Sequence, residues 1–308
     1  MKSKIIVLTP IKNEAWILAH FLSITSKFAD HIIILDQMSN DGSKAIAKKF
    51  EKVILLENNN SDYDEAYRQN ILINKARELF PDYKRILITL DADEFISANG
   101  IVSLEWKLIT SAKKGTVLYF EKPDLYLNAT DCVRYIDNKW PLGIVDDENL
   151  IHTATKIHSI RVPIHENSEK IYLNEIIFLH TAYLRPSIQR AKFRFYSVKE
   201  NINNSNPWYR RRRRYRAPNH LLIKPVISQT PTEWLAHEGF SLLDIKDSIE
   251  TWHNTIVAED ICNKGSIYFW LDDIWDISWN RYNRKQKIIS PPMLLTFFLR
   301  LFDKYILK

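Results

Sequence analysis

The chain has 308 residues and a formal net charge of +6, and its apolar (45%) and charged (26%) fractions are those of a folded globular protein, which excludes a disordered chain. Only six residues are glycine, whereas average usage is roughly 7% of a chain. Neither G-x-G-x-x-G nor G-x-x-x-x-G-K-[ST] occurs, so a Rossmann dinucleotide fingerprint and a P-loop are excluded, and any bound nucleotide must be held by side chains and a metal ion.

Strand and helix patterns alternate over the first hundred residues. Aliphatic, largely β-branched runs predict strands buried on both faces at 4–9, 31–35, 53–56 and 85–90. Helical patterns separate them at 14–28, 43–50 and 63–80. This order predicts a mostly parallel sheet with right-handed crossovers, the α/β architecture of many nucleotide-binding proteins.

The rest of the chain is less regular. Short strand-like pieces lie between 121 and 184, and the chain beyond 185 is mainly helical. We therefore predict an α/β domain over residues 1–190, followed by a mainly helical region over 191–308. The charge divides in the same way: residues 1–190 hold 24 Lys or Arg against 25 Asp or Glu, and residues 191–308 hold 19 against 12.

No targeting signal is recognisable. Pro10 interrupts the first apolar run, and no apolar run reaches the roughly 18 residues of a membrane span. Cys132 and Cys262 form no disulfide or metal-binding pattern. We predict a cytoplasmic protein with reduced thiols.

Three acidic residues follow the predicted strand 85–90. Asp91 and Asp93 leave its end on the same side, and Glu94 comes next. In an open α/β sheet, ligands bind beyond the carboxyl ends of strands, and carboxylates at this spacing can share a divalent cation that neutralises a diphosphate. The alternative is an acidic turn that caps the following helix. Because the neighbouring residues are apolar, a positive group is expected beside the acids.

Polar residues also follow the other predicted strands. They are Thr9, Pro10, Asn13 and Glu14 after the first, Asp36 and Asp41 after the second, and Arg68 after the third. Carboxylates accept hydrogen bonds from a uracil N–H or from ribose hydroxyls, and arginine pairs with phosphate. Each residue by itself is equally well explained by a turn or a helix cap. Together they favour one shared site.

Three segments resemble glycosyltransferase family 2, whose members have the GT-A fold. Thr9–Glu14 looks like the family's x-P-x-x-N-E opening, and Asp36–Ser43 looks like its D-x-x-S-x-D-G-S/T segment. Leu90–Phe95 looks like the L-D-A-D-E-F form of its D-x-D motif. The resemblance is clear over residues 4–97, partial to about 196 and absent beyond.

The resemblance implies a nucleotide-diphospho-sugar donor, above all a UDP-sugar, and a divalent cation, Mn²⁺ or Mg²⁺. Asp93, Asp91 and His180 would hold the metal. Residues of the matching motifs, together with Arg68 and the side chain of Lys192 on a later helix, would bind the donor. They are Thr9, Pro10, Asn13, Glu14, Asp36, Asp41, Arg68, Asp91, Ala92 and Lys192.

The resemblance also implies inversion at the anomeric carbon, with a carboxylate that deprotonates the acceptor hydroxyl. His165-Glu166 looks like an H-E pair of one subgroup of the family, which implies Glu166 as the base. Asp147 and Glu148, in a lengthened polar stretch at 138–152, remain alternatives. The subgroup implies a hexosyltransferase for a glycan or lipid-linked acceptor, as in surface polysaccharide synthesis.

The C-terminal region carries two features of its own. The run Arg210–Arg216 is isolated from any known nucleic-acid module, so we do not expect nucleic acid as a partner. Attraction to an anionic membrane or an acidic glycan and a solvated basic surface both remain open. The segment 292–308 fits a helix at the inner face of a membrane, a helix docked on the core, or an oligomer contact.

Two further functional classes compete with a glycosyltransferase. A sugar nucleotidyltransferase would show a Gly-rich basic loop after the first strand, whereas Thr9–Glu14 has no glycine and one lysine. A non-catalytic protein that binds a membrane or nucleic acid through Arg210–Arg216 is the other alternative.

Overall fold

A computed structural model describes residues 2–60, 62–126, 129–135, 138–216, 226–238, 245–248, 251–282 and 287–306. The chain divides into two compact units. Unit 1 comprises Met1–Leu184 and Pro225–Lys246, and unit 2 comprises Arg185–Lys224 and Asp247–Lys308. Unit 2 begins at Arg185 and not at residue 191, because the helix α6 (Pro186–Ile202) runs through the predicted boundary. No sequence pattern predicts the return of the chain to unit 1.

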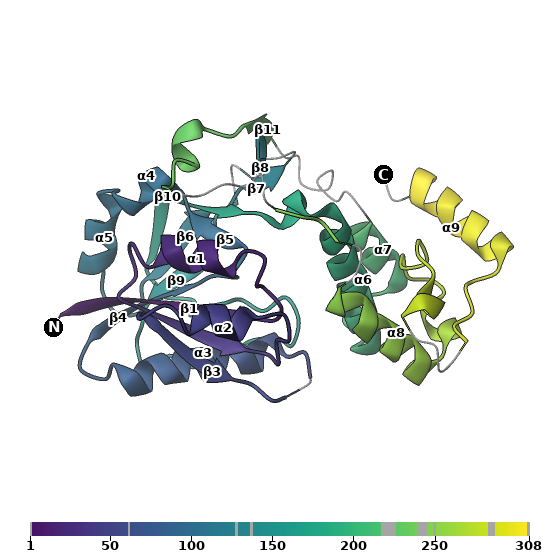
Figure 1. The fold of residues 1–308 in the computed structure, drawn as a ribbon, viewed down its shortest axis with the longest axis horizontal. Coiled ribbons are helices and arrows are strands. Elements are labelled where there is room, and N and C mark those ends of the chain that lie inside the picture. The colour runs from purple at the N-terminus through teal and green to yellow at the C-terminus, as the bar shows by residue number, and fades with distance from the viewer. Residues whose placement is uncertain are drawn as a thin grey trace. The chain divides into compact units, whose positions relative to one another are not determined.

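Unit 1 is built on a sheet of 11 strands with helices, which confirms the predicted α/β fold class. One half consists of four parallel strands in the order β4-β1-β2-β3 (Figure 1). They are β1 (Ser3–Ile11), β2 (His31–Asp36), β3 (Val53–Glu57) and β4 (Lys84–Thr89). They lie where the sequence predicts four strands buried on both faces, but only β1, β2 and β4 contain buried residues. β3 is the last strand of this half, and its residues are half-buried or exposed. Their carboxyl ends meet at one edge of the sheet, which we call the carboxyl edge.

The other half of the sheet is mixed. β9 (Trp140–Val145) runs antiparallel between β4 and β6 (Val117–Glu121), so β6 has the direction of β4. β10 (Lys170–His180) is parallel to β6, and β5 (Glu94–Ile96) pairs with its last residues. The end of β10 therefore lies beside the residues that follow β4.

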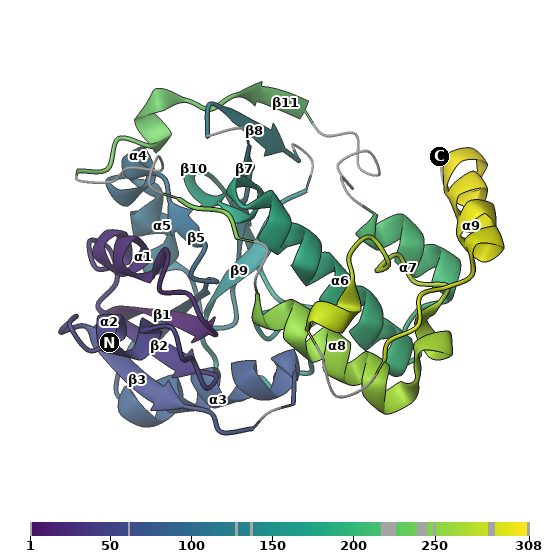
Figure 2. The same ribbon diagram turned by 45° about the vertical axis from the view of Figure 1, so that its right-hand side comes forward.

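Three short strands complete the sheet, and Figure 2 shows β8 next to β11. They are β7 (Asp124–Tyr126), β8 (Asp131–Arg134) and β11 (Val226–Gln229). β11 belongs to the segment that returns to unit 1, and it pairs antiparallel with β8.

Helices cover both faces of the sheet because successive strand residues point to opposite sides. Val7 packs on one face with α1 (Leu18–Thr25), and Leu8 packs on the other with α3 (Glu65–Leu79). The side chain of Asp64 caps α3 by accepting a hydrogen bond from the Tyr67 N–H at 2.9 Å. The shorter helical pieces of unit 1 are α2 (Ser43–Ala47), α4 (Ala98–Ile101), α5 (Glu105–Ser111), η1 (Ala182–Leu184) and η3 (Thr232–Trp234).

Unit 2 is helical in its described part. Besides α6 it contains α7 (Trp208–Tyr215), α8 (Trp252–Lys264), α9 (Met293–Tyr305) and the 3₁₀ turns η5 (Ser266–Phe269) and η6 (Trp279–Arg281). α6 and α8 lie side by side (Figure 2). The ring of Phe195 on α6 is edge-on to the ring of Trp252 on α8. No helix in the described ranges combines the length and the apolar character needed to cross a membrane.

The arginine run is not the open basic surface that the sequence suggests. Arg211 and Arg212 are buried on α7. Arg211 Nε lies 2.7 Å from Asp272 Oδ1, and Arg212 makes two bonds of 2.9 and 2.6 Å to the buried Asp303 of α9. Neighbouring residues of a helix point in directions about 100° apart, so a continuous run has to place some side chains against the core.

The remaining arginines of the run divide into two kinds. Arg214 pairs with the buried Glu200 at 3.2 Å, and Arg216 lies 3.9 Å from Asp303. Arg210 and Arg213 are exposed and make no ion pair with the described residues. Arg211 and Arg212 therefore stabilise unit 2 from within, whereas Arg214 and Arg216 pair with buried acids from its surface.

Candidate functional site

The acidic turn after β4 is stabilised by its own hydrogen bonds. The Glu94 N–H donates to the Asp91 carbonyl, and the Asp91 N–H donates to Glu94 Oε2, both at 3.0 Å. Glu94 then begins β5, pairs with His180 of β10 and is fully buried. Ala92 is also buried, whereas the side chain of Asp91 is 36% exposed at the carboxyl edge.

Two cations that the sequence analysis missed neutralise this turn. Arg161 binds Asp91 Oδ2 at 2.6 Å and Glu94 Oε2 at 2.5 Å, and Lys122 Nζ lies 2.8 Å from Glu94 Oε1. Burial by itself would raise the pKa of Glu94, but Arg161 and Lys122 hold it well below its usual range. The positive charge that the apolar surroundings require is thus supplied by side chains distant in sequence.

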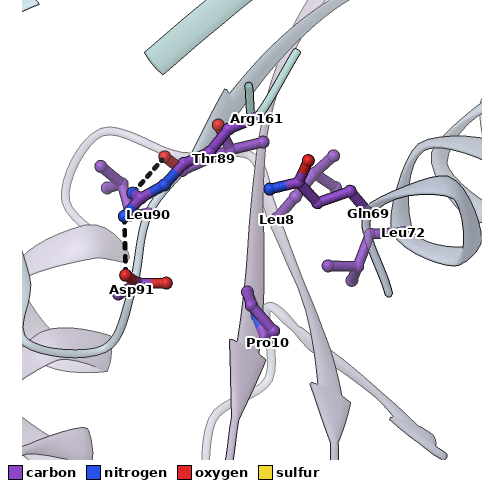
Figure 3. A pocket seen from close by; sticks show the side chains of 8 residues that line it. All are labelled: Leu8, Pro10, Gln69, Leu72, Thr89, Leu90, Asp91 and Arg161. Atoms are coloured by element: carbon purple, nitrogen blue, oxygen red, sulfur yellow. Dashed lines mark hydrogen bonds and ion pairs between the residues drawn. The ribbon is translucent and has the colours of Figure 1, made fainter. Parts of the chain in front are cut away.

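A pocket opens beside Arg161, between β1, β4 and α3 (Figure 3). Four of the eight residues that line it are apolar and four are polar or charged: Leu8, Pro10, Gln69, Leu72, Thr89, Leu90, Asp91 and Arg161. Of the predicted donor-binding residues, Pro10 and Asp91 therefore border the same space.

A chain of polar contacts runs through His180. Its Nε2 lies 3.6 Å from Asp93 Oδ2, and its Nδ1 lies 2.5 Å from Asp124 Oδ1. The Tyr135 hydroxyl donates to the other oxygen of Asp124 at 2.9 Å. Burial and Lys122 lower the pKa of His180, but Asp93 and Asp124 outweigh them and raise it to about 9. Without a metal ion the imidazolium therefore lies between two carboxylates at neutral pH, and a cation that binds Nε2 has to displace its proton.

Asp93 and His180 fit a divalent cation, whereas Asp91 is engaged by Arg161. Two ligands of one ion, each about 2.1 Å from it, are roughly 3 Å apart, and Asp93 Oδ2 and His180 Nε2 are 3.6 Å apart. A carboxylate on the other ring nitrogen, as Asp124 provides, orients metal-binding histidines. Across the described ranges no three His, Cys, Asp or Glu side chains gather closely enough to hold a metal. Further ligands would have to come from a diphosphate and water.

The loops after β1 and β2 are tied together by predicted donor-binding residues. Asn13 has a positive φ of 59°, its N–H donates to Ser39 Oγ at 2.8 Å, and its side-chain oxygen accepts from the Asn40 N–H. Asp41 accepts from the Ala15 N–H at 2.9 Å and from Ser43. Both side chains fix the loops, so their part in binding a donor stays a prediction.

Asp36 and Thr9 are buried near the carboxyl edge. Asp36 ends β2, and one of its oxygens accepts from the Ser39 N–H at 3.1 Å. Its other oxygen and Thr9 Oγ1 have no hydrogen-bond partner among the described residues.

Two further predicted donor-binding residues contact aromatic side chains. Glu14 accepts from the Trp16 indole N–H at 2.7 Å. The guanidinium of Arg68 lies over the Tyr63 ring, 4.5 Å from its centre.

The alternative bases Asp147 and Glu148 lie at the opposite edge of the sheet. Glu148 binds Arg85 at 2.9 Å and Lys114 at 3.1 Å, and Arg85 is the second residue of β4. Asp91 lies six residues further along the extended chain than Arg85, a span of about 20 Å. Asp147 accepts from the Asn149 N–H of its own turn. Neither carboxylate is brought to Asp91 and Asp93.

Glu166 and Lys192 come from segments outside the acidic turn. Glu166 is exposed on a turn between Arg161, at the carboxyl edge, and the start of β10 at Lys170, and its carboxylate binds none of the described residues. Lys192 lies on α6 of unit 2. The roles of both residues stay predictions.

Comparisons with known proteins add little to this geometry. No family model and no curated protein matches the chain. A mannosyltransferase from Pyrobaculum calidifontis, solved with GDP-mannose and Mn²⁺, shares 10% identity over 99% of this chain and 88% of its own, with a TM-score of 0.44.

Two other solved structures are more distant still. A 4-diphosphocytidyl-2C-methyl-D-erythritol synthase is 15% identical over 38% of this chain and 59% of its own, with a TM-score of 0.26. A glycosyltransferase involved in glycosylation of the major capsid of PBCV-1 is 12% identical over 39% and 50%, with a TM-score of 0.23. Likenesses this weak carry no argument, so the function has to be inferred from the chain's own residues.

Proposed function

We propose that the protein is a metal-dependent glycosyltransferase that moves a hexose from a nucleotide-diphospho-sugar to an acceptor hydroxyl. The observation that carries this proposal is the Asp93–His180 pair, held by Asp124 at the end of the acidic turn after β4. The pair lies at the edge of the α/β sheet where ligands bind in such folds. The three motifs that resemble glycosyltransferase family 2 are all at strand ends on this edge.

Each group at the edge has a separate task in this proposal. A bound Mn²⁺ or Mg²⁺ would neutralise charge on the departing diphosphate, with Asp93 and His180 as its protein ligands. Asp124 orients His180, and Arg161 fixes Asp91 next to the pocket. Asp36 and Glu14 accept hydrogen bonds from the base and ribose, for which the buried, unsatisfied oxygen of Asp36 is suited.

The finer parts of the proposal come from the family resemblance. They are inversion at the anomeric carbon, UDP as the nucleotide, and a glycan or lipid-linked acceptor. Glu166 is proposed as the base because its exposed carboxylate binds no described residue, whereas Glu148 is held by two cations. The base takes the acceptor proton as the oxygen attacks the anomeric carbon and the nucleoside diphosphate leaves.

Nucleoside diphosphates and nucleotide sugars should stabilise the protein only when Mn²⁺ is present. At a ligand concentration of 100 Kd, binding adds about 2.7 kcal/mol, which raises Tm by roughly 5–10 °C in a protein of this size. Thermal shift assays with UDP, GDP and their hexose conjugates, each with Mn²⁺ or EDTA, measure this. Absence of any shift in Tm at millimolar ligand would overturn the proposal. In a separate assay, release of pyrophosphate from a nucleoside triphosphate would indicate a nucleotidyltransferase instead.

Asp124→Asn should weaken Mn²⁺ binding in the presence of UDP by about 10–100-fold, the usual effect of losing a group that orients a metal-binding histidine. Tyr135→Phe is the matched control, because it removes the other hydrogen bond to Asp124 and leaves its charge in place. Its effect should be several-fold smaller. Calorimetric titration with Mn²⁺ compares the two, and unchanged affinity in Asp124→Asn would remove His180 from the metal site.

A further inference from the structure

The helix α9 presents a broad apolar face that no described residue covers. Leu294 is 81% exposed, and Phe297 and Phe298 are more than half exposed. The complete face consists of Met293, Leu294, Phe297, Phe298, Leu301 and Tyr305. At about 100° per residue these side chains fall within an arc of about 140°. A continuous exposed face with three aromatic rings is uncommon on a soluble monomer and marks an interaction surface.

The opposite side of α9 is anchored in unit 2. Leu299 is buried, and Asp303 pairs with the buried Arg212 of α7 at 2.6 Å. The ring of Phe302 lies 4.8 Å from the ring of Trp208. These contacts fix the rotation of α9 about its own axis, so the apolar face points away from the rest of unit 2.

The exposed charges of α9 itself are positive. Arg300 is exposed and lies just outside one edge of the apolar arc, and the exposed Lys304 lies just inside the same edge. The acid of α9, Asp303, is buried in its ion pair. An apolar strip bordered by cations is complementary to an anionic lipid surface.

We propose that α9 lies in the plane of an anionic membrane and inserts its apolar face at the level of the lipid headgroups. Its 13 residues measure about 20 Å, so the helix lies on the bilayer and does not cross it. A second copy of the chain is a poorer occupant, because a two-fold contact through this face brings Arg300 and Lys304 close to their counterparts. This proposal concerns the location of the protein and does not depend on the reaction.

Flotation with vesicles tests the surface directly. The full-length protein should bind vesicles that contain phosphatidylglycerol at least tenfold more tightly than pure phosphatidylcholine vesicles. L294S/F297S/F298S should lose this binding. The matched control is V102S/L104S/L108S in unit 1, whose three side chains are 80%, 69% and 55% exposed, and it should bind like the wild type.

Charge reversal distinguishes binding to an anionic membrane from nonspecific hydrophobic adsorption. R300E/K304E should weaken binding to anionic vesicles by about tenfold or more, since each basic residue near such a surface contributes about 1 kcal/mol. Equal binding by the wild type and L294S/F297S/F298S would overturn the proposal. Self-association is the competing outcome. If the wild type does not bind vesicles, and light scattering shows a wild-type dimer that L294S/F297S/F298S dissociates, the proposal is overturned in favour of a contact between two copies of the chain. The assay contains no nucleotide sugar, so failure of the proposed reaction leaves its result unchanged.

Discussion

Asp93→Asn is expected to lower kcat/KM for Mn²⁺-dependent donor hydrolysis by about 10²–10³-fold, the typical cost of removing one group that stabilises a developing negative charge. The asparagine keeps the size of the side chain. It also keeps the backbone carbonyl that accepts hydrogen bonds from the Thr181 N–H and hydroxyl. The fold should therefore survive while the negative ligand beside His180 is lost. Steady-state rates of nucleoside diphosphate release, measured over a range of Mn²⁺ concentrations, give the effect.

Two comparisons make this result specific. Asp82→Asn changes an exposed acid in the turn before β4, away from the carboxyl edge, and should leave kcat/KM unchanged. Asp91→Asn changes an acid that is paired with Arg161. It should weaken donor binding and leave the Mn²⁺ affinity close to that of the wild type. If Asp93→Asn hydrolyses donors at the wild-type rate, the metal does not bind at this turn.

Arg212→Met is expected to destabilise unit 2 by about 3–5 kcal/mol, because it removes both hydrogen bonds of the buried Asp303 carboxylate and leaves only Arg216, at 3.9 Å, as a nearby cation. The side chains of Arg212 and Asp303 are almost fully buried, at 6% and 5% exposure, so water cannot replace the lost contact. At roughly 2–4 °C per kcal/mol the Tm should fall by about 6–20 °C. Thermal unfolding followed by circular dichroism measures the change.

The neighbouring arginine is the matched control for this prediction. Arg213 is exposed and makes no ion pair with described residues, so Arg213→Met should change the stability by less than about 0.5 kcal/mol. The double variant R212M/D303L removes both charges and should recover most of the loss. Equal Tm values for Arg212→Met and Arg213→Met would mean that the arginine run is solvated, as a basic surface patch would be.

The parallel half of the sheet could be read from the sequence because each of its strands is a continuous apolar run. Such runs need burial on both faces, and that requirement forces helices onto both sides. The order of strands and helices then brings Thr9, Asp36 and Asp91 to one edge. The three motifs that resemble glycosyltransferase family 2 contain the same residues. The acidic turn, the strand ends and the fold class were thus accessible without a structure.

The mixed half of the sheet and the arginine run were not accessible in this way. The partners of the acidic turn, Lys122 and Arg161, come from 28 and 67 residues beyond Glu94. Asp124 meets His180 across 56 residues. A sequence shows that buried acids need positive neighbours, but it does not show which segment provides them. For the same reason Arg211 and Arg212 look like surface charges until their partners Asp272 and Asp303 are seen.

The sequence by itself thus determined where chemistry can occur: side chains, not glycine-rich backbone, must hold any nucleotide, and acids gather at the strand ends. The pattern of apolar and polar residues within short segments is enough to locate the strands and their ends, because each strand is recognised from its own residues. Only the tertiary structure decided how the charges are used. It showed Asp93 beside His180, Asp91 bound by Arg161, and Glu148 at the opposite edge. It also showed that Arg211 and Arg212 are buried inside unit 2. Ion pairs depend on contacts between distant segments, and those contacts exist only after the chain has folded.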